Sequence, residues 1–177
     1  SESTLSLPSF RPPQLATLEK KVPTGESWLF EIKYDGYRMQ AAIAGDQVRL
    51  YTRNGHDWTR QFGFVAPALS QLTKGTALID GELCALDESG RPDFTLLKNS
   101  LDGRTPVVFY GFDLLEQDGE DIAALPQLER KQRLEDLLQN LPPNAPVGYS
   151  EHIVGRGPEV FQLMCQRGFE GVIAKAP

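Results

Sequence analysis

The stretch Glu31-Ile32-Lys33-Tyr34-Asp35-Gly36-Tyr37-Arg38 decides the fold prediction for this chain. Residues 28–33 alternate between two sides, one of them apolar, which is the periodicity of a β-strand. The Asp-Gly pair that follows favours a turn, since glycine permits positive φ and aspartate tolerates turn conformations. The pattern therefore predicts a strand that ends at Lys33, followed by a turn that brings Arg38 back toward it.

A lysine at such a strand end is suited to nucleophilic attack on a phosphate. An ordinary lysine is protonated at neutral pH and cannot attack. Partial burial, or a neighbouring cation such as Arg38, would lower the pKa of Lys33 and free its lone pair. The same Glu-x-Lys-x-Asp spacing is equally compatible with a solvated charged turn, so this stretch alone leaves both interpretations open.

Length and composition predict one domain, residues 1–177, with a core of its own. No apolar run reaches membrane-spanning length, and the first residues do not resemble a signal peptide. Cys84 and Cys165 are too far apart to suggest a metal site, and we expect reduced thiols in a cytoplasmic protein. The net charge of −6 argues against a dedicated nucleic-acid module. DNA binding would need a local basic face or a second domain.

The rest of the pattern predicts antiparallel strands with few helices. Residues 1–13 are expected to be irregular, and turns are expected at 45–46, 54–55 and 87–90. Strands are expected at 38–44, 47–53, two segments within 76–86 interrupted at Asp80-Gly81-Glu82, 107–115, 147–153 and 171–175. Helices are expected at 64–72, 125–141 and 158–167, with a helical turn at 94–98. Residues 15–22 fit either a short helix or a packed approach to the first strand.

Lys33-x-Asp35-Gly36-x-Arg38 resembles motif I of the covalent nucleotidyltransferases: DNA ligases, RNA ligases and mRNA capping enzymes. In that superfamily the lysine forms a phosphoamide with a nucleoside monophosphate. The resemblance implies that Lys33 is the covalent attachment site and that Arg38 lies near the nucleotide. It also implies that Glu31 reads the edge of the base.

Asp80-Gly81-Glu82 resembles motif III of the same superfamily, which implies that Glu82 accepts a hydrogen bond from the ribose. Alone, Asp-Gly-Glu is most often a surface turn. Apolar runs flank it here, and acids within an apolar run need a partner, which makes them site candidates.

Residues 109–115, Phe-Tyr-Gly-Phe-Asp-Leu-Leu, resemble motif IIIa, and imply that Phe112 stacks on the purine. The alternative for Phe112 is a plain core position. Thr52-Arg53-Asn54-Gly55 resembles the ligase segment after motif I, whose arginine contacts phosphate; the alternative for Arg53 is an exposed edge-strand arginine.

Residues 170–175, Glu-Gly-Val-Ile-Ala-Lys, resemble motif IV of DNA ligases. The resemblance implies that Glu170 lies near the phosphate and its metal, that Ile173 covers the second face of the adenine, and that Lys175 lies near the nucleotide. The alternative is the start of a strand with a solvated acid.

The motifs together, in this order, are similar to bacterial ATP-dependent ligases of the ligase D type, which serve non-homologous end joining. This resemblance implies an α+β nucleotidyltransferase fold, ATP-grasp-like, with antiparallel sheets flanked by helices and the nucleotide between the sheets. It implies ATP, Mg²⁺ or Mn²⁺ at Glu170, nicked or broken duplex DNA, and other end-joining proteins as partners.

Two features of the family are missing from the pattern: motif V and the C-terminal OB-fold domain with motif VI. We therefore expect this chain by itself to be impaired in full ligation. Two alternatives remain at this point. One is an RNA ligase or capping-type nucleotidyltransferase, and the other is a non-catalytic module that binds a nucleotide or a DNA end.

Overall fold

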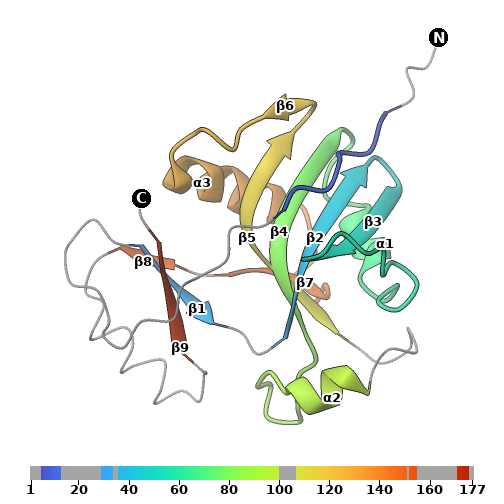
Figure 1. Ribbon diagram of the computed structural model, residues 1–177, viewed down its shortest axis with the longest axis vertical. Coiled ribbons are helices and arrows are strands. Elements are labelled where there is room, and N and C mark those ends of the chain that lie inside the picture. Colours follow the sequence, from blue (N-terminus) through green and yellow to red (C-terminus); the bar gives the residue numbers. More distant parts are fainter. Residues whose placement is uncertain are drawn as a thin grey trace.

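A computed structural model describes residues 5–12, 29–33, 36–99, 107–150, 152–154 and 171–175, with side chains described in 5–12, 36–99 and 107–150. The described residues form two β-sheets and three helices. The smaller sheet and the larger one lie beside each other (Figure 1). The predicted α+β architecture of sheets flanked by few helices is confirmed.

The larger sheet has the strand order β3-β2-β4-β5-β6. Its strands are β2 (Tyr37–Ala44), β3 (Gln47–Thr52), β4 (Thr76–Cys84), β5 (Val108–Gln117) and β6 (Glu120–Asp121). Neighbours along this order pair antiparallel, whereas β7 (Val147–Tyr149) adds to β5 in parallel. The β2–β3 hairpin turns at Gly45, whose φ of 59° suits glycine, as predicted.

The smaller sheet has the order β8-β1-β9, with β1 at Leu29–Lys33, β8 at His152–Val154 and β9 at Gly171–Lys175. The predicted strand at 171–175 is confirmed, and the one predicted at 28–33 is confirmed over its described residues, 29–33. The prediction of one strand at 147–153 is wrong, because this run divides between the two sheets. The Ser150 amide still donates to the Gly111 carbonyl at 2.8 Å, while His152 already pairs with Glu31 of β1.

The prediction that 76–86 forms two segments interrupted at Asp80-Gly81-Glu82 is also wrong, because β4 runs through this point. Gly81 lies so close to β5 that an added Cβ would stand 2.5 Å from Cζ of Phe109. Asp80 is ion-paired with Arg38 of the neighbouring strand β2. The glycine is therefore needed for close approach between strands and does not form a turn.

The helices are α1 (Ala66–Leu69), α2 (Phe94–Lys98) and α3 (Gln127–Leu138). The Asp93 carboxylate caps α2 by accepting from the Leu96 amide at 2.9 Å. α1 and α3 are shorter than the predicted 64–72 and 125–141, whereas the predicted helix 158–167 and the segment 15–22 lie outside the described residues. None of the described helices is long and apolar enough to span a membrane.

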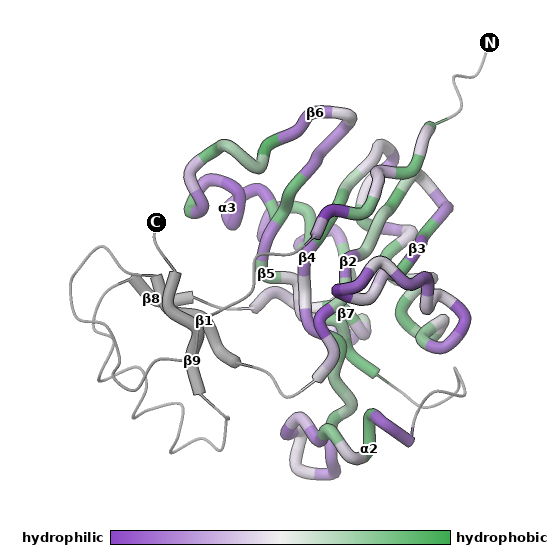
Figure 2. The backbone as a smooth tube through the Cα atoms, viewed as in Figure 1, coloured by the Kyte–Doolittle hydropathy of each residue, from purple (hydrophilic) through white to green (hydrophobic). Residues whose placement is uncertain are grey.

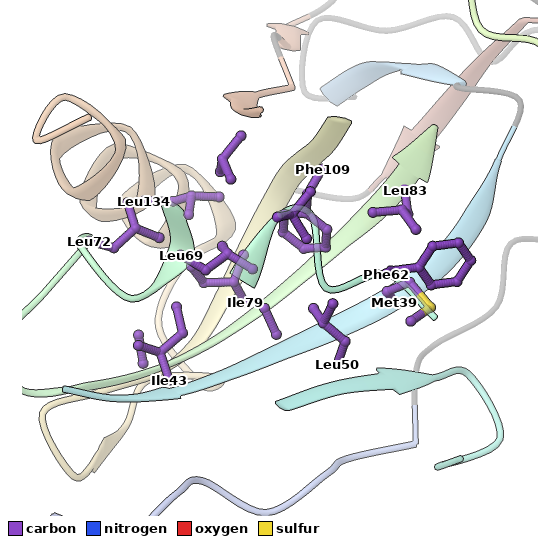
Figure 3. Close-up of a cluster of buried hydrophobic side chains, with 14 of the residues drawn as sticks. Met39, Ile43, Leu50, Phe62, Leu69, Leu72, Ile79, Leu83, Phe109 and Leu134 are labelled. Atoms are coloured by element: carbon purple, nitrogen blue, oxygen red, sulfur yellow. The ribbon is translucent and has the colours of Figure 1, made fainter. Parts of the chain in front are cut away.

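The core lies against one face of the larger sheet, where side chains of β2, β4 and β5 meet those of α1, α3 and Phe62 (Figure 3). α3 is largely hydrophilic along its length (Figure 2), because only one stripe, with Leu134 and Leu137, turns toward the core. The opposite face of the same strands carries the polar residues of interest.

Candidate functional site

Strand alternation places the predicted site residues of β2 and β4 on the face of the larger sheet that lies away from the core. Met39 and Ile79 belong to the core cluster, so their neighbours Arg38 and Asp80 point to the other face. Glu82 follows Asp80 by two residues and shares that face. Arg38 and Glu82 are directly opposite each other in the β2–β4 register.

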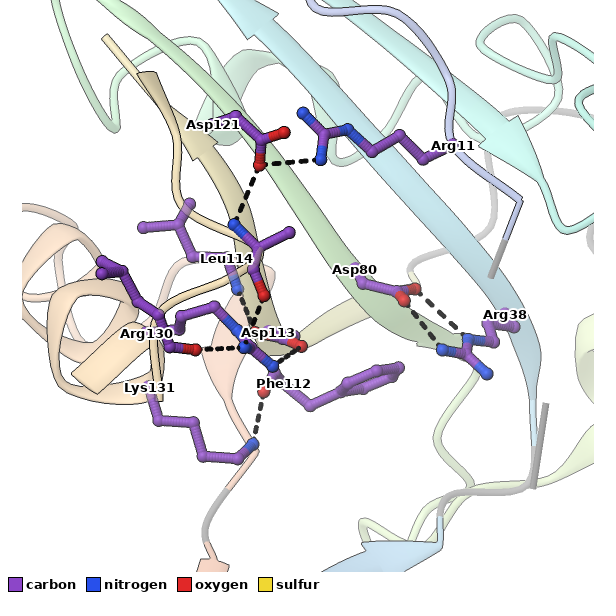
Figure 4. A network of polar contacts seen from close by, with 11 residues as sticks. Arg11, Arg38, Asp80, Phe112, Asp113, Leu114, Asp121, Arg130 and Lys131 are labelled. Carbon is purple, nitrogen blue, oxygen red and sulfur yellow. Dashed lines mark hydrogen bonds and ion pairs between the residues drawn. The ribbon is translucent and has the colours of Figure 1, made fainter. Parts of the chain in front are cut away.

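Arg38 is held by a two-point ion pair with Asp80. Its Nε donates to Oδ1 at 3.3 Å and its Nη2 to Oδ2 at 2.8 Å. The Asp80 side chain is 6% exposed and that of Arg38 is 22% exposed. The guanidinium lies over the ring of Phe112, with Cζ 5.2 Å from the ring centroid, a cation–π geometry (Figure 4). Arg38, Asp80 and Phe112 therefore form one packed unit.

Phe112 occupies a β-bulge between β4 and β5. Asp80 pairs with Asp113 and Gly81 with Gly111, so Phe112 has no residue opposite it on β4. Bulges re-aim side chains and are frequent beside functional sites. Phe112 is buried but is not a member of the core cluster. Since it is only 7% exposed, a base can stack on its ring only after a covering group, such as Arg38, moves aside.

Two cations of α3 form hydrogen bonds with residues of this bulge. Arg130 donates to both oxygens of Asp113, at 2.9 and 3.1 Å, and Nζ of Lys131 donates to the carbonyl oxygen of Phe112. Sequence reasoning missed both residues. The available signal was that Lys131 falls three residues before Leu134, on the buried stripe of α3.

The smaller sheet carries the predicted nucleophile at the end of a strand. Lys33 is the last residue of β1 and lies opposite Gly171, while Glu31 lies opposite Ile173. Lys175 lies opposite Leu29, so its backbone is about 13 Å along the strand from that of Lys33. The register therefore brings Glu31 and Ile173 together and separates the two lysines.

The link between the two sheets is short. β1 ends at Lys33 and β2 begins at Tyr37. Five residues of extended chain span about 18 Å at most, which sets an upper limit on the distance between the Cα atoms of Lys33 and Arg38. Lys33 is thus tethered close to the polar face of the larger sheet.

The predicted phosphate contact Arg53 is exposed, in the loop after β3. This loop is closed by the Gly55 amide, which donates to the Thr52 carbonyl at 2.8 Å, and Gly55 has a φ of 84°, as its predicted turn requires. Arg49, on the same edge, is paired with Asp57 at 3.3 Å, so its charge is partly neutralised.

The predicted metal ligand Glu170 lies outside the described residues. Among the residues that the structure does describe, no group of three or more His, Cys, Asp or Glu side chains could hold a metal ion. The acids of the polar face do not form such a group either, and Asp80 is already engaged with Arg38.

Residues 5–12 cross the polar face as a strap without helix or strand structure, as predicted for this segment. The Arg11 amide donates to Oε1 of Gln40 at 3.0 Å, and Nε2 of Gln40 donates back to the Arg11 carbonyl at 2.5 Å. The Arg11 guanidinium contacts Asp121 at 3.0 Å and Glu116 at 3.5 Å. The hydrogen bond from Arg11 lowers the pKa of the Asp121 carboxyl below its ordinary value.

Comparison with known proteins identifies the family to which this chain belongs. Residues 13–177 match the family described as ATP dependent DNA ligase domain. The chain is 40% identical over 171 residues to the multifunctional non-homologous end joining protein LigD of Pseudomonas aeruginosa, covering 96% of this chain and 20% of that protein. It is 36% identical over 149 residues to the LigD protein of Mycobacterium tuberculosis, covering 84% of this chain and 19% of that protein.

Solved structures agree with this match. A mycobacterial DNA ligase D complexed with ATP and MES superposes with a TM-score of 0.75 at 32% identity, covering 87% of this chain and 52% of that chain. The ligase domain of M. tuberculosis LigD superposes with a TM-score of 0.74 at 34% identity, covering 84% of this chain and 48% of that chain. The chain therefore belongs to the ATP-dependent DNA ligase domain family and has the nucleotidyltransferase fold of that family's adenylation domains.

Proposed function

We propose that this chain is the adenylation domain of an ATP-dependent ligase that seals DNA breaks in end joining. The observation that carries the proposal is the meeting of Arg38, Glu82 and Phe112, from three different strands, on one face of the larger sheet. β1 leads from Lys33 into that face across a very short link. The match to end joining proteins of the LigD type supports the same function.

In the proposed reaction the neutral amine of Lys33 attacks the α-phosphorus of ATP. An N–P bond forms, the bond from the α-phosphorus to the bridging oxygen breaks, pyrophosphate leaves, and the amine proton passes to solvent. The AMP then moves to the 5′-phosphate of a DNA break, and the 3′-hydroxyl displaces it. The protein contributes mainly positioning and charge stabilisation.

The nucleotide is proposed to lie between the two sheets. Phe112 would stack on one face of the adenine and Ile173 would cover the other, while Glu82 would accept from the ribose and Glu31 would read the base edge. The adjacency of Glu31 and Ile173 in the β1–β9 register supports this arrangement.

Arg53, Glu170 and Lys175 are proposed to lie toward the phosphates. We propose that Mg²⁺ or Mn²⁺ binds at Glu170.

The proposed substrate is nicked or broken duplex DNA with a 5′-phosphate and a 3′-hydroxyl. Because the net charge is −6, we propose that a further domain, of the OB-fold kind, supplies cations for the DNA backbone. The proposal places the protein in the bacterial cytoplasm, beside the nucleoid and other end-joining proteins. The alternatives, an RNA ligase, a capping-type enzyme or a non-catalytic binding module, are not favoured by the family match.

Peptide mapping by mass spectrometry tests the nucleophile. After incubation with ATP and Mg²⁺ or Mn²⁺, the wild-type chain should carry added AMP on the peptide that contains Lys33, and Lys33→Ala should carry none. Lys74→Ala, which removes an exposed lysine from the loop before β4, is the matched control and should label normally. An adduct that persists in Lys33→Ala would contradict the proposal.

Nucleotide analogues test the ribose contact. Glu82→Ala should weaken ATP binding and have less effect on 2′-deoxy-ATP, which lacks the hydroxyl that Glu82 would accept from. Equal weakening for both nucleotides would exclude this role for Glu82. Labelling with GTP in preference to ATP would favour a capping-type enzyme.

A further inference from the structure

Helix α3 directs two consecutive cations, Arg130 and Lys131, at the bulge that carries Phe112. We call these two residues the α3 latch. We propose that the α3 latch positions Phe112 for nucleotide binding, so that Arg130 and Lys131 set the affinity for ATP without touching it. This inference rests on the proposed function of the chain as an adenylation domain.

The first reason is the burial of Lys131, which is 0% exposed. An ammonium is costly to bury unless it is hydrogen-bonded, and an apolar side chain of similar length would fill the same space without that cost. Its neighbours on the buried stripe, Leu134 and Leu137, are apolar. The ammonium of Lys131 has a visible use, since it donates to the carbonyl of Phe112.

The second reason is what the bulge requires. Gly111 and Leu114 both face the core: Leu114 is a member of the core cluster, and a Cβ at Gly111 would stand 3.2 Å from Ile79. These residues are three apart, and a regular strand would put them on opposite faces. The extra residue at Phe112 resolves this conflict, but it disrupts the ladder and leaves backbone groups that need other partners. Lys131 is such a partner.

The third reason is that Arg130 anchors the next residue. Oδ1 of Asp113 accepts from both Arg130 and the Leu114 amide, the latter at 2.9 Å. Arg130 also donates to the carbonyls of Ala123 and Leu125, at 2.9 and 2.6 Å. The latch thus ties the bulge to the segment that leads into α3.

In Figure 4 the ring of Phe112 points toward the Arg38–Asp80 pair. Lys131 contacts the backbone carbonyl of Phe112, and Arg130 contacts the side chain of Asp113. Phe112 is therefore held at two places: Lys131 binds its backbone carbonyl, and Arg38 lies over its ring. Shifting the backbone would move the ring relative to Arg38 and to any base stacked on it.

The test compares two buried residues of one helix. Lys131→Met keeps the length and packing of the side chain but removes the ammonium. Leu137→Ala is the matched control, because it destabilises α3 in the core and leaves both latch residues in place. Complete loss of base stacking would weaken ATP binding by roughly 5- to 150-fold. We expect Lys131→Met to weaken ATP binding several-fold and by no more than that loss. Leu137→Ala should bind ATP like wild type despite a lower Tm.

A double-mutant cycle separates positioning from general damage. In a Phe112→Ala background, Lys131→Met should cause little further loss of ATP affinity, because the ring it positions is gone. Equal losses in both backgrounds, or wild-type affinity in Lys131→Met, would overturn the inference.

A readout without nucleotide separates this inference from the proposed function. The ring resonances of Phe112, assigned from the spectrum of Phe112→Leu, should shift in Lys131→Met and stay in place in Leu137→Ala. If the Phe112 ring resonances do not shift in Lys131→Met, the inference about the α3 latch is overturned, whatever the ATP affinity of the variant. A ring that shifts in a protein whose wild type binds no ATP would contradict the proposed function instead.

If Lys131→Met does not fold, Asp113→Asn tests the contribution of Arg130. This change keeps the shape of the side chain but weakens the two hydrogen bonds from Arg130. It should move the same resonances and weaken ATP binding by a smaller factor. Unchanged resonances in a folded Asp113→Asn would count against the proposal.

Discussion

Phe109 and Phe112 lie three residues apart on β5, yet they belong to different parts of the molecule. Phe109 is fully buried in the core cluster, whereas Phe112 stands in a bulge beneath the guanidinium of Arg38. The residue type is the same, and because residues three apart on a strand point to opposite faces, alternation puts one ring in the core and the other against Arg38.

The same contrast holds for the two faces of β2, β4 and β5. The core face is apolar and stabilises the fold by burial. The opposite face buries charge, as at Asp80, which is 4% exposed, and this is tolerable because Arg38 pairs with it at two points. The core face therefore depends on packing and the polar face depends on keeping its partners.

The largest expected effect comes from breaking the core face. Phe109→Ala should lower the free energy of unfolding by about 3–5 kcal/mol, because a fully buried ring leaves a cavity. Urea denaturation measures this loss. A loss below about 1 kcal/mol would mean that the core collapses around the site, and would remove the contrast with Phe112.

Phe112→Ala is the matched change on the polar face. It should weaken ATP binding by about 1–3 kcal/mol if base stacking is lost, and it should lower stability less than Phe109→Ala does. Calorimetric titration with ATP and thermal unfolding must be measured together. A loss of stability with unchanged ATP affinity would assign Phe112 to the core.

Asp80→Asn tests the pairing on the polar face. It weakens the two charge-assisted hydrogen bonds that the partly buried Arg38 makes with Asp80, and should destabilise the protein by about 1–3 kcal/mol. Asp57→Asn is the control, since the Arg49–Asp57 pair is exposed, at 53% and 42%, and exposed pairs contribute about 0–1 kcal/mol. Chemical denaturation of both variants gives the comparison, and equal losses would show that burial of the Arg38–Asp80 pair is unimportant.

The smallest effect is expected at the strap, where the exposed Asp121 accepts from Arg11. The pKa of Asp121 lies below its ordinary value of 3.8, mainly because of that hydrogen bond. A carboxyl with a lowered folded-state pKa stabilises the protein above the unfolded value, and this contribution is lost as pH falls through the folded one. The Tm difference between wild type and Asp121→Asn should therefore be small at pH 7 and disappear as the pH falls below the folded-state pKa of Asp121. A difference that persists in acid would contradict the ion-pair explanation.

Much of this structure follows from local patterns. The strand that ends at Lys33, the Gly45 and Gly55 turns and the strand at 171–175 were predictable, because alternation and glycine placement act over a few residues. Arg38, Glu82 and Phe112 could be grouped only through their resemblance to known motifs. Their roles toward a nucleotide stay predictions.

The sequence by itself determined the periodicity of the strands, the positions of the turns and the family motifs, since each is written in neighbouring residues. The tertiary structure alone decided three other features: the path of β4 through Asp80-Gly81-Glu82, the division of 147–153 between two sheets, and the bulge at Phe112. Each depends on a partner far away in the chain. Arg38 neutralises Asp80 across 42 residues, Phe109 requires Gly81, and Lys131 reaches the Phe112 carbonyl across 19 residues. Strand alternation specifies which face a side chain takes, but pairing between distant residues decides where that alternation is interrupted.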